Sequence, residues 1–175
     1  MRPHRSPQIV ARQFWRGLLL ACAMVLVHVA PASAGCTGLG CSCSISADPL
    51  DFGTYNPLAS SNVDAVGNVS VTCGALILGA LISYEVTLDP GGSGSSLNRS
   101  MSNGSGAMMY NLYTDSSHTQ IWGDGSGGTD TITNSHLLSL IFSITDDIPI
   151  YGRIPTGQNA EAGSYSDTIV ATVIF

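Results

Sequence analysis

The chain has 175 residues, of which 44% are hydrophobic and 10% charged, and its formal net charge is −6 at pH 7. Its six basic residues are all arginine and face twelve acidic ones, which makes nucleic acid and anionic membrane surfaces poor partners. Twenty glycines, with many serine, threonine and asparagine residues, favour short strands joined by turns over long helices.

Residues 1–34 have the organisation of a secretory signal peptide. An apolar stretch from Leu18 to Val29 precedes the small-residue site Ala32-Ser33-Ala34 and follows four basic residues, Arg2, Arg5, Arg12 and Arg16. We expect cleavage after Ala34, which leaves residues 35–175 with a net charge of −10. Leu19-Leu20-Ala21-Cys22 mimics a lipobox, but the apolar run continues well past Cys22. This run is short for a membrane span, so we expect an exported chain without stable membrane insertion.

Four cysteines follow the expected cleavage site: Cys36, Cys41, Cys43 and Cys73. In an exported chain an even number indicates disulfides, and the Cys-x4-Cys-x-Cys spacing lacks the paired knuckles of a zinc site. Four cysteines allow three pairings. Cys43 and Cys73 each fall on the apolar face of a predicted strand, which favours a Cys43–Cys73 bridge and leaves Cys36–Cys41 as the second pair.

The first half of the domain predicts three strands after a short glycine-rich segment, 35–42. The first strand begins near Cys43 and resumes after Asp48-Pro49 as far as Phe52; the second covers 68–73 and the third 82–88. Between the last two, the run Ala75–Leu81 is apolar on both faces. It is either buried or an exposed apolar loop that contacts a surface or a partner.

The second half predicts three more strands, at 108–112, at 136–145 and in the C-terminal segment 163–175. The last strand places Val170 and Ile174 on one face, and on the other Tyr165, Ile169, Ala171, Val173 and Phe175. The chain ends on an apolar residue within this strand, where most domains end in frayed polar residues. Six main strands in one domain indicate an all-β sandwich or barrel.

Motifs for catalysis or cofactor binding are not found in the sequence. The segment "GDGSGG" (123–128) has neither the Gly-x-Ser-x-Gly spacing of a nucleophile elbow nor the ligand series of a calcium loop, and is interpreted as a glycine-rich turn. His118 and His136 are the histidines after the leader, and neither has a recognisable nucleophile at a fixed spacing. We therefore expect no enzymatic activity, no metal and no cofactor.

Seven segments occur in an order that resembles one known family: "CSISADPLDFGTYNP", "VSVTC", "LNRSM", "MYNLYTD", "WGDG", "YGRIP" and "GSYSDTIVATVIF". Together they resemble the spore coat protein U domain family, which includes subunits of archaic (Csu-type) chaperone–usher pili of Gram-negative bacteria. Cys43 and Cys73 match the cysteine pair of the family. Asp167 and Thr168 match its final-strand motif, and the turn before it is matched by Gly152, Arg153 and Pro155.

The resemblance implies an immunoglobulin-like β-sandwich that lacks its seventh strand. A groove beside the last strand would accept a strand first from a periplasmic chaperone and then from the next pilus subunit, with assembly at an outer-membrane usher. The contact residues would be Tyr165, Ile169, Ala171, Val173 and Phe175, with the Phe175 carboxylate anchored in a basic pocket of the chaperone. The chain would pass through the periplasm to a surface fimbria.

The sequence departs from a repeating pilus subunit at its N-terminus. Residues 35–42 offer only Leu39 and two cysteines, whereas a donor strand needs some ten alternating apolar residues. This favours a minor or terminal subunit. Two alternatives stay open: an adhesin module that binds surfaces through Ala75–Leu81 or the glycine-rich loops, and a self-contained secreted coat or matrix protein.

Overall fold

The computed structural model describes residues 34–175 except 139–141. The expected signal peptide therefore lies, apart from Ala34, outside the described residues. Within the described part, no helix has the length and hydrophobicity that a membrane crossing requires.

Ten strands and two short 3-10 turns make up the described domain. The turns are η1 (Gly91–Ser93) and η2 (Ser96–Asn98). The strands are β1 (Gly35–Thr37), β2 (Ser42–Ala47), β3 (Val63–Gly74), β4 (Ala80–Leu88), β5 (Ser100–Ser102), β6 (Ala107–Met109), β7 (Asn111–Tyr113), β8 (Ile132–Leu138), β9 (Ser143–Ile154) and β10 (Ala171–Ile174).

The first sheet is built around β4. One edge of β4 pairs with β8, from Ala80 to Val86. Its residues Leu81–Ser83 also pair with β1, and Glu85–Leu88 pair with β10. Because a strand has two edges, β1 and β10 must lie end to end along the edge of β4 opposite β8.

The second sheet has the order β2-β3-β9-β7, and β5 and β6 form a separate hairpin. β3 and β9 are paired along their whole length, from Val63 opposite Ile154 to Gly74 opposite Ser143. Pro149 is tolerated inside β9 because β7 pairs only with residues 151–153, so the proline lies beyond the end of β7.

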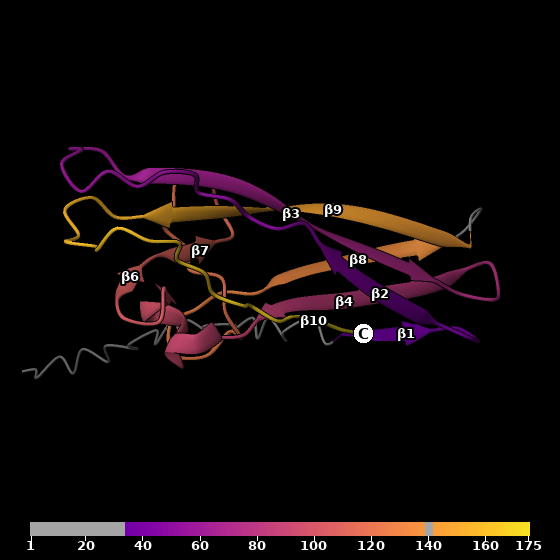
Figure 1. The fold of residues 1–175 in the computed structure, drawn as a ribbon. Helices are drawn as coiled ribbons and strands as arrows, with labels where there is room; N and C mark the ends of the chain where they lie inside the picture. The colour runs from indigo at the N-terminus through magenta and orange to yellow at the C-terminus, as the bar shows by residue number, and fades with distance from the viewer. Residues whose placement is uncertain (1–33, 139–141) are drawn as a thin grey trace, which may run out of the picture. The chain divides into compact units, whose positions relative to one another are not determined.

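The two sheets form two layers around one core, as Figure 1 shows with β3 and β9 above β4. Because side chains along a strand point alternately to its two faces, every second residue of β3 and β4 points into this core. These inward residues are at most 1% exposed at Val69, Val71, Ile82 and Val86. Trp122 is fully buried, and its indole N–H donates to the Val86 carbonyl at 3.0 Å. The all-β fold predicted from the sequence is confirmed.

Two predicted strands are wrong in their bounds. The strand expected over 136–145 is two strands, because β8 ends at Leu138 and pairs with β4, whereas β9 begins at Ser143 and pairs with β3. The strand expected over 108–112 is likewise split into β6 and β7. It divides at Tyr110, whose backbone N–H donates to the Arg99 carbonyl at 3.0 Å in the register of the β5–β6 hairpin, whereas β7 begins at Asn111 and pairs with β9.

The predicted extent of two other strands also changes. The continuation of the first strand through Leu50 and Phe52 is irregular, as is most of 163–170 before β10. In Ala75–Leu81, Ala75 and Ala80 are buried, but Leu76, Ile77, Leu78 and Leu81 are 76%, 41%, 50% and 44% exposed. The middle of this run is therefore an exposed apolar loop.

Candidate functional site: a groove beside the C-terminal segment

A groove opens between two chain segments that are far apart in the sequence. One wall comes from Ala47 to Phe52, at the end of β2 and just after it, and the other from Tyr165 to Ala171, leading into β10. Together they enclose about 420 Å³ over a floor of six core side chains, Val69, Leu88, Met101, Tyr110, Leu112 and Ile150. The groove thus reaches down to the core of the sandwich.

A second cavity of about 650 Å³ extends the groove toward residues 160–164. It shares Leu50, Phe52, Met101 and Tyr165 with the first cavity, so the two adjoin. Gly152 of β9 shapes this junction, since a Cβ there would lie 2.7 Å from Phe52 Cζ. Only glycine lets the Phe52 ring rest on β9 at this point.

The wall in front of β10 is fixed by the Asp167 carboxylate. Asp167 Oδ2 accepts from the Tyr110 hydroxyl at 2.8 Å, and Oδ1 accepts from the backbone N–H of Gly92 at 2.9 Å. Burial and this hydrogen bond raise the pKa of Tyr110 well above its ordinary value. Tyr110 therefore stays a neutral donor that holds the 165–169 segment in place.

Arg99 is fully buried and supports the segment before β10 through contacts with Asp89. Its guanidinium donates to the Asp89 carbonyl at 2.7 Å and to Asn111 Oδ1 at 2.9 Å. Asp89 in turn accepts from the Val170 backbone N–H at 2.9 Å. Burial lowers the pKa of Arg99. Sequence analysis missed this residue, and its position in the segment "LNRSM" was the only signal for it.

Four of the five predicted contact residues line or flank the groove: Tyr165, Ile169, Ala171 and Val173 are half-buried against the core. The fifth, Phe175, is 43% exposed and lies outside this packed set. On the opposite face Val170 and Ile174 are 55% and 47% exposed, as their alternation requires. Among the described residues, β10 pairs only with β4.

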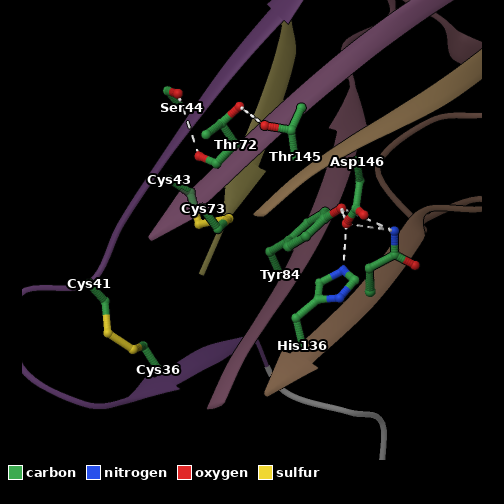
Figure 2. The surroundings of a disulfide bond; sticks show 11 residues. Cys36, Cys41, Cys43, Ser44, Thr72, Cys73, Tyr84, His136, Thr145 and Asp146 are labelled. Carbon is green, nitrogen blue, oxygen red and sulfur yellow. Dashed lines mark hydrogen bonds and ion pairs between the residues drawn. A yellow bond between two sulfur atoms is a disulfide. The ribbon is translucent and has the colours of Figure 1, made fainter. Parts of the chain in front are cut away.

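Figure 2 shows both disulfides, which join cysteines of β1, of the turn that follows it, of β2 and of β3. Cys43 is bonded to Cys73 across β2 and β3, and Cys36 is bonded to Cys41 across the turn between β1 and β2. The first residues after the expected cleavage site are thus paired with β4 and closed into a loop within their own domain.

A polar cluster bridges the two sheets close to the Cys43–Cys73 disulfide (Figure 2). Asp146 of β9 accepts a hydrogen bond from the buried Tyr84 hydroxyl of β4, and its Oδ2 lies 2.6 Å from His136 Nε2 of β8. Burial, followed by this hydrogen bond, raises the pKa of Tyr84 to about 12. The cluster joins the layers without providing a nucleophile.

Arg153, which the family resemblance placed in the turn before the final segment, lies in β9 opposite Asp64 of β3 and forms a two-pronged ion pair with it. Its Nε and Nη2 donate to the two carboxylate oxygens at 2.6 Å and 2.7 Å. The Arg153 hydrogen bond holds the pKa of Asp64 below its usual range. His118 packs edge-on against Tyr113, with its Nε2 3.9 Å from the same carboxylate. These contacts fix β3 to β9 near their ends.

Comparison with known proteins agrees with the family suggested by the sequence. The model of the Spore Coat Protein U domain matches residues 35–172. Protein U of Myxococcus xanthus is 33% identical over 150 residues, which cover 78% of this chain and 79% of that protein.

Among solved structures, the chain is similar to a chain in the pre-assembly complex of the chaperone CsuC and the tip adhesion subunit CsuE, from archaic chaperone–usher Csu pili of Acinetobacter baumannii. The TM-score is 0.49 and the sequence identity 22%; the match covers 77% of this chain and 40% of the other, so the chain spans less than half of that protein. The family match and the identity with Protein U carry the assignment: the chain belongs to the Spore Coat Protein U domain family.

Proposed function

We propose that the chain is an exported structural subunit of a surface fimbria, assembled through a periplasmic chaperone and an outer-membrane usher by donor-strand complementation. The groove between residues 47–57 and 160–171 carries this proposal. Its floor consists of core side chains, and the adjoining β10 offers an edge that is free among the described residues. The matched family is a structural one, so we assign no catalytic role.

The physical reason is the cost of leaving such a groove in water. Unpaired strand edges promote aggregation, and uncovered core side chains lose the stabilisation that burial would give. An extended partner strand that pairs with β10 removes both costs at once. The groove contains Asp48, Asp51, Glu161 and Asp167 but neither arginine nor lysine, which favours a neutral or basic donor strand.

The N-terminal segment supports a minor or terminal position in the fibre. Residues Gly35–Thr37 are paired with β4, and the Cys36–Cys41 disulfide closes the following turn. A segment that is already paired within its own domain cannot easily serve as the donor strand of a neighbouring subunit. On this proposal the subunit accepts a strand and does not donate one from residues 35–42.

Co-purification with an archaic periplasmic chaperone tests the proposal. We expect Ile169→Asp to abolish the complex, because Ile169 lines the groove and a carboxylate there would be desolvated by the donor strand. Val170→Asp is the matched control, since the Val170 side chain is 55% exposed on the opposite face. Equal recovery of both variants with the chaperone would exclude the groove as the binding site.

A second candidate function, adhesion to apolar surfaces, is favoured by one end of the sandwich. Leu39, Leu76, Leu78 and Phe142 are 69%, 76%, 50% and 57% exposed there. Backbone hydrogen bonds hold their loops together, from Leu76 N–H to the Leu39 carbonyl at 3.0 Å and from Ala75 N–H to the Phe142 carbonyl at 2.9 Å. The stretches 35–47, 65–84 and 131–145 contain no aspartate, glutamate, lysine or arginine. An uncharged apolar end of this kind suits contact with an apolar surface.

Retention on a hydrophobic surface tests this second function. Leu78→Asp should reduce binding of the isolated protein, whereas Leu58→Asp should not, because Leu58 is 93% exposed in the loop before β3, away from the apolar end. If both variants bind like the unmodified protein, the apolar end has no adhesive role.

A further inference from the structure

We propose that β1 and β10 form one composite acceptor edge, so that an incoming strand pairs with the N-terminal as well as the C-terminal segment of this chain. The inference rests on the proposed donor-strand function and deepens it. It gives Gly35–Thr37 a role in accepting a strand, where their position at the start of the domain suggests donation.

The register of β4 places the two short strands in line. β10 pairs with Leu88, Thr87, Val86 and Glu85, and β1 continues with Ser83, Ile82 and Leu81. On β4, only Tyr84 lies between the residues that pair with β10 and those that pair with β1. Both strands are antiparallel to β4 and occupy the edge opposite β8, so their outer backbone groups form a single row. At roughly 3.4 Å per residue this row is about 24 Å long.

Three contacts hold β1 on this edge. The Cys36–Cys41 disulfide closes the loop that leads to β2. Thr37 Oγ1 accepts from the Leu81 backbone N–H at 3.3 Å. Gly38 lies so close to β4 that a Cβ would be 2.8 Å from Ala80 Cβ. A three-residue strand with such support is fixed before any partner arrives, and a partner that pairs with it loses less entropy.

The composition of the edge also suits a partner strand. Exposed edges in monomeric proteins are usually protected by charged side chains, proline or bulges. Neither Gly35-Cys36-Thr37 nor Ala171-Thr172-Val173-Ile174 contains a charged residue or a proline. We therefore assign this edge to one occupant, an extended uncharged segment of another protein, long enough to pass β10 and reach β1.

Two synthetic peptides test the composite edge on the full chain, expressed with its own leader and recovered from a bacterial periplasm. Both alternate isoleucine and serine; one has about 8 residues and spans the whole edge, and the other has about 4 and covers β10 alone. Peptide dissociation is measured from the unmodified protein, from Cys36→Ser/Cys41→Ser, and from Leu39→Ser. The last is a control in the same loop that leaves the disulfide intact.

We expect the long peptide to leave Cys36→Ser/Cys41→Ser roughly tenfold faster than the other two proteins, since loosening β1 removes one or two backbone hydrogen bonds. The short peptide should leave all three at the same rate. Hydrogen exchange in the unmodified protein gives a measurement that needs no variant: only the long peptide should slow exchange in the amides of residues 35–37.

Two other results would contradict the inference. If both peptides bind but neither protects residues 35–37, and both dissociate equally from all three proteins, β1 is not part of the acceptor edge while donor-strand binding stands. If neither peptide binds the unmodified protein, the proposed function itself is wrong, and the composite edge with it.

Discussion

Cys43 and Cys73 are bonded to each other and lie directly opposite one another on β2 and β3, with their Cα atoms 4.1 Å apart. This is close to the spacing of a pair without backbone hydrogen bonds between antiparallel strands, where side chains approach most closely. The bond ties β2, whose end forms one wall of the groove, to the long strand β3. It therefore supports the groove as well as the core.

Removing this bond should destabilise the domain more than removing the other disulfide. Cys43 and Cys73 are 30 residues apart and Cys36 and Cys41 are five apart. Loop-closure entropy then predicts losses of about 3–4 kcal/mol for Cys43→Ala/Cys73→Ala and about 2 kcal/mol for Cys36→Ala/Cys41→Ala. Urea unfolding of both double variants measures the difference. A larger loss of unfolding free energy in Cys36→Ala/Cys41→Ala than in Cys43→Ala/Cys73→Ala would contradict the supporting role given to the Cys43–Cys73 bond.

The two arginines of the domain should differ sharply in their effect on stability. Arg99→Met removes the Arg99 donor of the Asp89 carbonyl in a buried site and leaves Asn111 Oδ1 with the Leu112 N–H alone, which should cost about 3–5 kcal/mol. Arg153→Met removes an ion pair with the 45% exposed Asp64, which should cost about 1 kcal/mol or less. Denaturant unfolding compares them. Equal losses would contradict the structural role given to Arg99.

Alkaline pH should destabilise the fold partly through Tyr84. Its pKa rises from 10.0 in the unfolded chain to about 12 in the folded one, because the folded state favours the neutral phenol. The corresponding stability is fully present below pH 10 and is lost as the pH rises through about 12. Tyr84→Phe should show a smaller fall in unfolding free energy over this interval. Parallel profiles for the variant and the unmodified protein would contradict the assignment.

Strand positions with clear alternation could be predicted from the sequence. In the strand predicted over 82–88, the alternate residues Ile82, Tyr84, Val86 and Leu88 are all at most 2% exposed. The same reasoning placed Cys43 and Cys73 on the apolar faces of neighbouring strands, where the structure pairs them. Period-two patterns are informative here because one face of each strand meets the core.

Changes of sheet could not be predicted, because they leave no local signal. Alternate apolar residues run through Leu138, Leu140, Phe142 and Ile144, yet β8, which ends at Leu138, pairs with β4, and β9, which begins at Ser143, pairs with β3. Arg99 was missed for a related reason. A lone arginine in a polar segment is expected to be exposed, and its burial depends on Asp89 and Asn111, which lie 10 and 12 residues away in the sequence.

Thermal unfolding combined with size-exclusion chromatography, with and without a donor-strand peptide from an archaic chaperone, tests the central claim most directly. The protein is the full chain recovered from the periplasm. If the groove awaits a partner strand, the protein alone aggregates or unfolds at low temperature, and the peptide raises the midpoint sharply. A stable monomer whose midpoint does not respond to the peptide would contradict this account and favour a self-contained secreted coat or matrix protein.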